Sequence, residues 1–195
     1  MADLERYQRK RDFSSTAEPR GRQHSSTGDP HFVIQHHLAT ADHYDFRLEI
    51  DGVLVSWAVP KGPSTDPKVK RMAVRTEDHP LDYETFEGTI GTGQYGHGVV
   101  LVWDRGTFRN TSTAHGQPVS AAAGLERGHL SFELAGEKLQ GGFALSRLPD
   151  EKRETWLLVK KTGSGADARR NPTSTQPESV LTGRTLDQIA DEATE

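Results

Sequence analysis

Residues 43–49 read His-Tyr-Asp-Phe-Arg-Leu-Glu, and this alternation of polar and apolar residues predicts a β-strand. The apolar positions carry aromatic and branched side chains of the kind that fill cores: Tyr44, Phe46, Leu48 and Ile50. The opposite face carries ionisable side chains: His43, Asp45, Arg47 and Glu49. A row of imidazole, carboxylate and guanidinium groups favours a metal and phosphate site. A half-exposed strand with salt-bridging side chains would show the same pattern, so both interpretations stay open.

The next residues predict a hairpin. Asp51-Gly52 is the dipeptide preferred in type I′ turns, and Val53–Val59 follows as the returning strand. Further short strands are predicted at 32–37, 70–76, 99–103 with a continuation at 107–109, 130–134, 143–148 and 156–161. The chain contains 19 Gly and 10 Pro, and residues 88–98 read as an irregular glycine-rich loop. Runs of strands without intervening helical patterns predict an all-β fold, a barrel or a sandwich.

The pattern divides the chain into three parts. Residues 1–30 are predicted to be a polar, partly ordered arm with a short helix near residues 4–10. Residues 31–161 contain the strands. Residues 162–195 are predicted to be a flexible linker followed by a short helix, which opens on a capping box at Thr185 and runs to Ala193.

Composition narrows the function classes. The chain has 195 residues, is 33% hydrophobic and contains no cysteine, which excludes disulfides and thiolate metal sites. The net charge of -4 argues against nucleic-acid binding by bulk positive charge, although basic clusters occur at 6–11 and 61–75. No apolar run is long enough for a membrane span, and the first residues lack a signal peptide's apolar region. We therefore expect a cytoplasmic protein.

Two histidines and one aspartate are candidates for metal binding. His37 ends the first predicted strand, Asp45 lies on the polar face of the next, and His79 lies in an Asp-His-Pro loop. Two imidazoles and a carboxylate suit Mn²⁺, Fe²⁺ or Zn²⁺ and leave room for water and substrate. The alternative is that each is a surface or hydrogen-bonded residue, as most of the 9 histidines must be.

Other residue types fit phosphate chemistry. Arg47 and Arg71 offer planar forks that match phosphate oxygens, although Arg47 can equally pair with a carboxylate on its own strand. His43 is a candidate proton donor or phosphate ligand, and Tyr83 a hydrogen-bond donor to the same group. No Ser, Thr or Cys stands in a recognisable nucleophile context, which favours attack by water at a metal ion.

Several long motifs carry a family resemblance. They are residues 9–13, 32–49, 51–64, 77–83, 86–88, 93–96 and 102–107, which include Glu-Asp-His-Pro-Leu-Asp-Tyr and Val-Trp-Asp-Arg-Gly-Thr. Over residues 6–161 the chain resembles the 3′-phosphoesterase domain of bacterial ATP-dependent DNA ligase D. The resemblance implies a compact closed β-barrel of short antiparallel strands. It also implies a Mn²⁺-dependent phosphodiesterase and phosphomonoesterase, which removes 3′-terminal ribonucleosides and 3′-phosphates in non-homologous end joining.

The resemblance also implies roles for particular residues. The metal ligands fall on His37, Asp45 and His79, with Zn²⁺ or another divalent transition metal as an alternative ion, and His43 and Arg47 fall at the scissile phosphate. Other active-site positions of the family fall on Gln35, Arg71, Tyr83, Arg11, Asp12 and Glu18. The implied substrates are DNA or RNA–DNA primer-template 3′ ends, which implies a cytoplasmic protein associated with the nucleoid. No ligase or polymerase motif occurs in the 195 residues, so an ATP-dependent DNA ligase would act in cis or in trans.

Two other interpretations compete with an end-processing enzyme. A catalytically weak adaptor would bind DNA ends or a ligase, but it would not need the candidate ligands. An unrelated small-molecule metalloenzyme on a similar barrel would not require the paired arginines.

Overall fold

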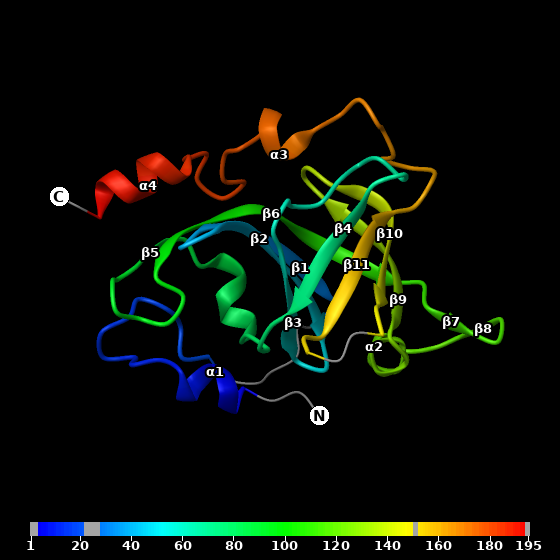
Figure 1. Cartoon of the computed structure of the whole chain (residues 1–195), viewed down its shortest axis with the longest axis horizontal. Helices are drawn as coiled ribbons and strands as arrows, with labels where there is room; N and C mark the ends of the chain where they lie inside the picture. The colour runs from blue at the N-terminus through cyan, green and yellow to red at the C-terminus, as the bar shows by residue number, and fades with distance from the viewer. Residues whose placement is uncertain (1–3, 22–27, 150–151, 194–195) are drawn as a thin grey trace.

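A computed structural model describes residues 4–21, 28–149 and 152–193 (Figure 1). Within these residues the main feature is a closed barrel of eight antiparallel strands, as predicted. Its strands, in the order in which they pair, are β1 (His31–Leu38), β2 (Asp42–Ile50), β3 (Val53–Val59), β4 (Lys70–Arg75), β11 (Thr155–Lys160), β10 (Gln140–Arg147), β9 (His129–Gly136) and β6 (Gly98–Asn110). Pairing of β6 with β1 closes the barrel.

Smaller elements surround the barrel. Strand β5 (Gly88–Ile90) extends the sheet beside β6, and β7 (Thr113–Ala114) pairs with β8 (Gln117–Pro118). The helices are α1 (Glu5–Arg9), the 3₁₀ helix η1 (Leu81–Thr85), α2 (Ala121–Arg127), α3 (Pro172–Thr175) and α4 (Leu186–Glu192). None of the helices in the described ranges has the length and apolarity needed to cross a lipid bilayer.

The β2–β3 hairpin forms as the dipeptide predicts. Ile50 pairs with Val53, and Asp51 and Gly52 have φ values of 51° and 79°. Two positive φ angles are the signature of a type I′ turn, whose twist matches that of the flanking strands. The hairpin therefore fixes which residues of β2 point into the barrel.

The barrel core contains side chains from every barrel strand. It takes Tyr44, Phe46, Leu48 and Ile50 from β2, and three fully buried tryptophans, Trp57, Trp103 and Trp156. The rings of Trp57 and Trp156 meet edge to face with their centroids 5.7 Å apart. The apolar face predicted for residues 44–50 is thus the inner face of the wall.

A second apolar cluster, here called the outer cluster, lies on the other side of this wall. It packs α1 and η1 against β1, β3 and β6 through Tyr7, Val33, Leu54, Leu81, Tyr83, Phe86, Ile90, Val100 and Val102. On β1, Val33 of this cluster stands between Phe32 and Ile34 of the barrel core. Burial on both faces explains why Val99–Trp103 reads as an unbroken apolar run. The polar side of β2 is consequently covered by a second layer.

Strand β6 is continuous where the sequence pattern predicts a break. Its pairing with β1 shifts register between Ile34 and Gln35, so that Ile34 pairs with Asp104 and Gln35 with Val102. Such a bulge reverses the alternation of faces along one strand. Because the buried face changes within β6, the sequence pattern predicted two separate strands at 99–103 and 107–109 where the structure has one.

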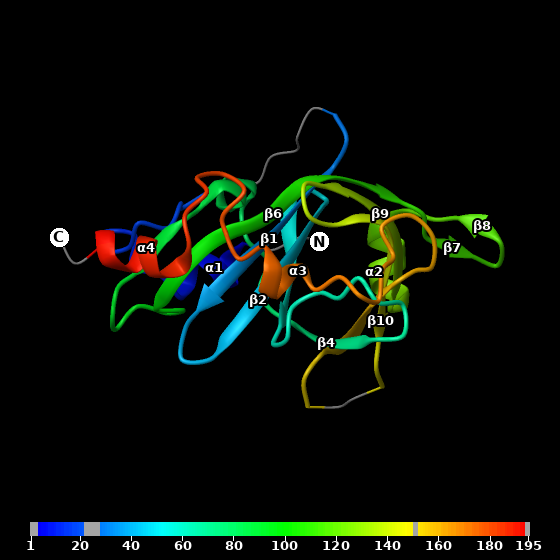
Figure 2. The same ribbon diagram turned by 90° about the horizontal axis from the view of Figure 1, so that it is seen from above.

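The C-terminal segment packs along the barrel, although its composition predicts a flexible linker. Trp103 Nε1 donates to the carbonyl of Gln176 at 2.8 Å, and Ile189 of α4 is buried in the barrel core. The predicted capping box forms, with Thr185 and Gln188 exchanging side-chain to backbone hydrogen bonds. The tail and the N-terminal arm lie on opposite sides of the barrel (Figures 1 and 2). The division of the chain at residues 30 and 161 stays a prediction.

Candidate active site

The polar side chains of β1 and β2 come together because the two strands pair in antiparallel register. His37 is opposite His43, and Gln35 is opposite Asp45. Side chains at directly opposed positions share a face, so both pairs point toward the layer formed by the arm and η1. A cavity of about 290 Å³ opens there, lined by residues of both strands, the arm, η1 and the loop at 91–97.

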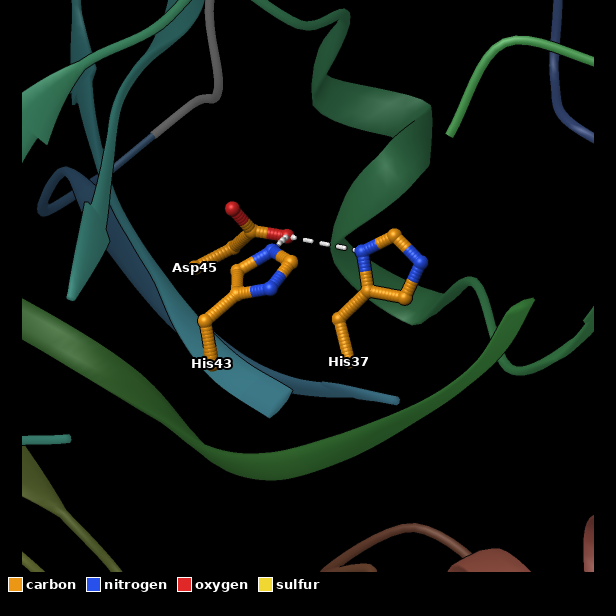
Figure 3. Close-up of side chains that lie close together, drawn as sticks. All are labelled: His37, His43 and Asp45. Atoms are coloured by element: carbon orange, nitrogen blue, oxygen red, sulfur yellow. Dashed lines mark ion pairs between the residues drawn. The ribbon is translucent and has the colours of Figure 1, made fainter. Parts of the chain in front are cut away.

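His37, His43 and Asp45 form a compact group. Each offers one ligand atom, and these atoms lie within 4.8 Å of one another. Both imidazole rings turn toward the carboxylate (Figure 3). His37 Nδ1 and His43 Nε2 each lie 3.6 Å from Asp45 Oδ2. His43 Nδ1 lies 3.0 Å from the carbonyl oxygen of Ala41, which orients its ring.

This group has the chemistry and spacing of a metal site. Two ligand atoms at about 2.1 Å from one ion lie about 3.0–3.4 Å apart, so separations of 3.6 Å come close to ligand spacing. The same separations are too long for good hydrogen bonds. The other ring nitrogen of His37, Nε2, is buried without a partner among the described residues, whereas Nδ1 faces Asp45 (Figure 3). Nitrogen and oxygen donors of this kind fit Mn²⁺, Fe²⁺ or Zn²⁺.

Asp45 is ionised at neutral pH. Burial opposes its ionisation, but the Arg47 charge and the neighbouring imidazoles of His37 and His43 outweigh burial and hold the pKa of Asp45 well below its usual value. The same carboxylate raises the pKa of His43, against the effect of burial. The group therefore presents a permanent negative charge between two imidazoles.

Arg47 lies beneath this group and is almost completely buried, with 2% exposure. Nε donates to Gln35 Oε1 at 2.8 Å, Nη1 donates to Ser56 Oγ at 2.9 Å, and Nη2 lies 3.2 Å from Asp45 Oδ2. Gln35 in turn donates to the carbonyls of Tyr83 and Phe86. The pairing of Arg47 with Asp45, which the sequence left as an alternative, is present, and the guanidinium still contributes its charge to the cavity wall.

His79 belongs to a different part of the cavity. Its backbone bonds to Leu54 in both directions, which holds the Asp-His-Pro loop against β3. Nδ1 lies 3.0 Å from both Arg47 Nη1 and the carbonyl of Glu77. Burial and the charges of Arg47 and Arg11 lower the pKa of His79 well below its usual value, so the ring is neutral. His79, which the sequence predicted as the third ligand, does not belong to the compact group.

The N-terminal arm closes one side of the cavity through a buried ionic network. Arg11 Nε donates to Glu18 at 2.8 Å, and Nη1 donates to Glu77 at 2.7 Å. Tyr83 Oη donates to Glu18 at 2.9 Å, which ties η1 to the arm. Asp12 does not line the cavity; it is exposed and accepts hydrogen bonds from the Ser14 backbone and hydroxyl.

Arg71 lies away from the other predicted site residues. It pairs with Leu158 on the face of β4 that also carries Ala73, and both Leu158 and Ala73 belong to the barrel core. Arg71 does not line the cavity, and its Nε is buried without a partner among the described residues. The active-site role implied for Arg71 by the family resemblance stays a prediction.

Several residues in or beside the cavity were not predicted. Glu77 pairs with Arg11 and Lys10, and Ser56 accepts from Arg47. Tyr95 lines the cavity mouth. Glu77, Tyr95 and Ser56 all occur inside quoted motifs, which is the signal that could have identified them. Ser56 carries a second signal, as a hydroxyl within the otherwise apolar run 53–59.

The fold and the site together define a closed β-barrel with a candidate divalent-metal group and buried arginine charge in one cavity. Residues 35–147 match the family of the DNA ligase D 3′-phosphoesterase domain. The chain belongs to this family, which confirms the resemblance seen in the sequence.

Relatives extend the match toward both ends of the chain. The multifunctional non-homologous end joining protein LigD of Pseudomonas aeruginosa is 52% identical over 188 residues, which cover 94% of this chain and 22% of that protein. The multifunctional non-homologous end joining DNA repair protein LigD of Mycobacterium tuberculosis is 46% identical over 155 residues, covering 79% of this chain and 19% of that protein. The chain thus spans about a fifth of the length of these relatives.

Proposed function

We propose that this protein is a metal-dependent phosphoesterase that processes DNA 3′ ends. It removes 3′-terminal ribonucleosides and 3′-phosphates and leaves 3′-hydroxyls for end joining. Family membership supports hydrolysis of phosphoester bonds and a role in end processing. The observation that carries the proposal is the position of His37, His43 and Asp45 beside Arg47 in one cavity.

The geometry favours exchanging the roles that the sequence assigned to two histidines. His43 lies with His37 and Asp45, so we assign these three residues to the metal. His79 lies next to Arg47, so we assign it to the phosphate. A divalent ion bound here would neutralise phosphoryl charge and lower the pKa of water. Mn²⁺ is the proposed ion, and Zn²⁺ is compatible with the same donors.

The other residues hold and orient the phosphate. Arg47 and Arg11 add positive charge to the cavity wall, and their contacts with Gln35, Ser56, Glu18 and Glu77 keep both guanidiniums in place. Such fixed charges stabilise the extra negative charge of a phosphoryl transition state without reorganisation. In the tautomer whose Nδ1 accepts from Arg47 Nη1, neutral His79 carries its proton on Nε2 and can donate it to a phosphoryl oxygen or leaving group. Gln35 and Tyr83 act as positioning residues, because their polar groups face Arg47 and Glu18.

The partners follow from the same proposal. The substrates are 3′ ends of DNA or RNA–DNA primer-templates, and an ATP-dependent DNA ligase, in the same polypeptide or in another, uses the resulting 3′-hydroxyl. With a net charge of -4, grip on the DNA terminus comes from Arg47, Arg11 and the bound metal ion and not from a broad basic surface.

A primer-template with a 3′-phosphate or a 3′-terminal ribonucleotide tests the proposal, with and without Mn²⁺. Wild type releases phosphate or nucleoside only with the metal. His37→Ala, His43→Ala and Asp45→Asn lose both turnover and Mn²⁺ binding in calorimetry, whereas His79→Ala loses turnover and keeps Mn²⁺ binding. His97→Ala, at an exposed position outside the cavity, is the control. DNA binding without turnover in wild type would support the adaptor instead.

A further inference from the structure

The cavity has a second wall with a different chemistry. This wall contains Ala39, Ile90, Tyr95 and Gly96. The same cavity is also lined by the proposed metal group, His37, His43 and Asp45, and by Arg47 and Arg11. Tyr95 is 50% exposed, one of the few large apolar side chains in the described residues with so much open surface. It is outside both apolar clusters. Packing in an apolar cluster therefore does not explain why an aromatic residue stands at position 95.

The Tyr95 ring is nevertheless anchored. Its hydroxyl accepts a hydrogen bond from Lys10 Nζ at 2.9 Å, and the same ammonium lies 4.2 Å from the ring centroid. Lys10 is held by the buried Glu77 carboxylate at 2.6 Å. The loop has a second tie to the arm, because Gln94 Nε2 donates to Ser15 Oγ at 2.9 Å. A chain of charged contacts thus holds an open aromatic ring at the mouth of the cavity.

We propose that Tyr95 is the stacking platform for the nucleoside attached to the phosphate in the cavity. The inference rests on the proposed function, because a phosphate at Arg47 and the metal group brings its nucleoside to the same cavity. Every base has a flat π-face, so an aromatic side chain accepts any of the four bases. The anchored hydroxyl lowers the entropy lost when a base stacks, since the ring is already in place. The apolar residues Ala39 and Ile90 complete the wall beside it.

Binding tests the platform independently of turnover. The probe is a primer-template whose 3′-terminal nucleotide is 2-aminopurine with a 3′-phosphate, titrated with protein in EDTA. Wild type quenches the fluorescence of the terminal base, because stacking quenches 2-aminopurine, and does not quench the probe when it is moved five nucleotides inward. Tyr95→Leu binds without terminal quenching. Quenching by Tyr95→Leu equal to that by wild type would overturn the proposal.

Kinetic measurements distinguish base stacking by Tyr95 from a purely structural role, in which Tyr95 would act as a latch that holds the loop at 91–97 against the arm. On a 3′-phosphate primer with Mn²⁺, Tyr95→Leu raises KM about ten-fold while kcat changes much less, in line with the measured worth of base stacking. Tyr95→Phe keeps the ring, loses the Lys10 hydrogen bond and raises KM only about two-fold. An abasic terminal residue abolishes the difference between wild type and Tyr95→Leu. Gln94→Ala, which breaks the other tie, leaves KM unchanged.

The outcomes are distinguishable from those of the proposed function. If Tyr95→Phe and Gln94→Ala were as impaired as Tyr95→Leu, the ring would be a latch and the stacking proposal would be wrong. If wild type quenched the terminal base but turned over no primer, the platform would stand and the phosphoesterase proposal would fail.

Discussion

The N-terminal arm and the C-terminal tail are both polar segments outside the barrel strands, yet different contacts hold them. The arm is held by side chains of opposite charge, with Arg11 between Glu18 and Glu77. Residues 162–176 of the tail are held largely through main-chain carbonyls, and later residues are held through side chains such as that of buried Ile189. Lys160 Nζ donates to the carbonyl of Ser164 at 2.7 Å, and Lys138 Nζ and Trp103 Nε1 both donate to the carbonyl of Gln176.

The two kinds of contact place different demands on the amino-acid sequence. Arm residues need particular side chains, because their partners are buried carboxylates at the cavity. Tail residues 162–176 offer carbonyl groups, which every residue has, and the specific partners are lysines and a tryptophan of the barrel. Because such contacts need no particular side chains, a segment held in this way can have the polar composition of a flexible linker. We therefore expect arm variants to change activity and variants of the tail's partners to change stability.

The largest expected effect is that of Arg11→Met. The side chains of Glu18 and Glu77 are 0% and 3% exposed, so loss of the guanidinium leaves two buried carboxylates without it and loosens the arm beside the cavity. We expect kcat/KM for a 3′-phosphate primer to fall about 10²-fold. Arg9→Met is the matched control, since Arg9 pairs with Glu5 at a 74% exposed position on the same arm. Equal effects of the two variants would contradict a functional role for the buried network.

Lys160→Met should act on stability instead. Lys160 Nζ donates to the carbonyls of Gly142, Lys161 and Ser164, and the residue is only 2% exposed. We expect the free energy of unfolding in urea to drop by about 2 kcal/mol, as for loss of hydrogen bonds from a charged group. Activity per folded molecule stays at the wild-type level. The neighbouring exposed Lys161→Met serves as control, and a comparable loss in that variant would refute the buried-contact explanation.

The contribution of Lys138 to stability should depend on pH. Burial lowers the pKa of Lys138 from 10.5 to about 8, only partly opposed by the charges of Asp104 and Glu178. Between those two values the unfolded chain binds more protons at this residue than the folded chain, so its contribution to stability rises with pH. The stability difference between wild type and Lys138→Met should therefore increase from pH 8 to pH 10.5, on the order of 1 kcal/mol. A difference that shrinks over this range would contradict the lowered pKa.

The smallest expected effect is at the end of the tail. Thr185→Ala removes the cap from α4, where Thr185 accepts from the Gln188 backbone. We expect about 0.5 kcal/mol of local destabilisation, the lower end for such a cap. Hydrogen exchange at the Ile189 amide should accelerate, because this amide bonds to the Thr185 carbonyl. Thr162→Ala, at an exposed position, should leave the exchange of this amide unchanged.

Much of the fold could be predicted because the alternation of apolar and polar residues shows, from a few neighbouring residues, which face of a strand is buried. The alternation in 43–50 and the turn at Asp51-Gly52 placed β2 and β3 correctly. Helix α2 was missed because it is only 7 residues long and interrupted by Gly124, although Ser120 caps its start and Gly128 its end. Strand β5 was missed because its 3 residues, Gly88–Ile90, are paired only through the non-local contact with β6.

For the candidate site, the sequence predicted which side chains share one face of a strand, but not which side chains of different elements lie close together. Period 2 put His43, Asp45 and Arg47 on one side of β2, but it cannot say whether His43 or His79 lies nearer to His37 and Asp45. That comparison needed the register of β1 against β2, which sets His37 opposite His43. Arg71 shows the same limit, because the pattern in 70–75 predicts Met72 and Val74 on the buried face, whereas Met72 is 49% exposed and Ala73, on the face of Arg71, is buried.

The alternation along β2 also has a consequence for how this protein can change over time. Core rings and site groups occupy successive positions of the same strand, so point substitution can alter one set while leaving the other in place. Gain or loss of a single codon within 43–50 would exchange the two sets across the wall, sending carboxylate and imidazole into the interior and phenyl rings into the cavity. Length variation should therefore be confined to connections such as 111–120, and β2 should remain free of insertions and deletions.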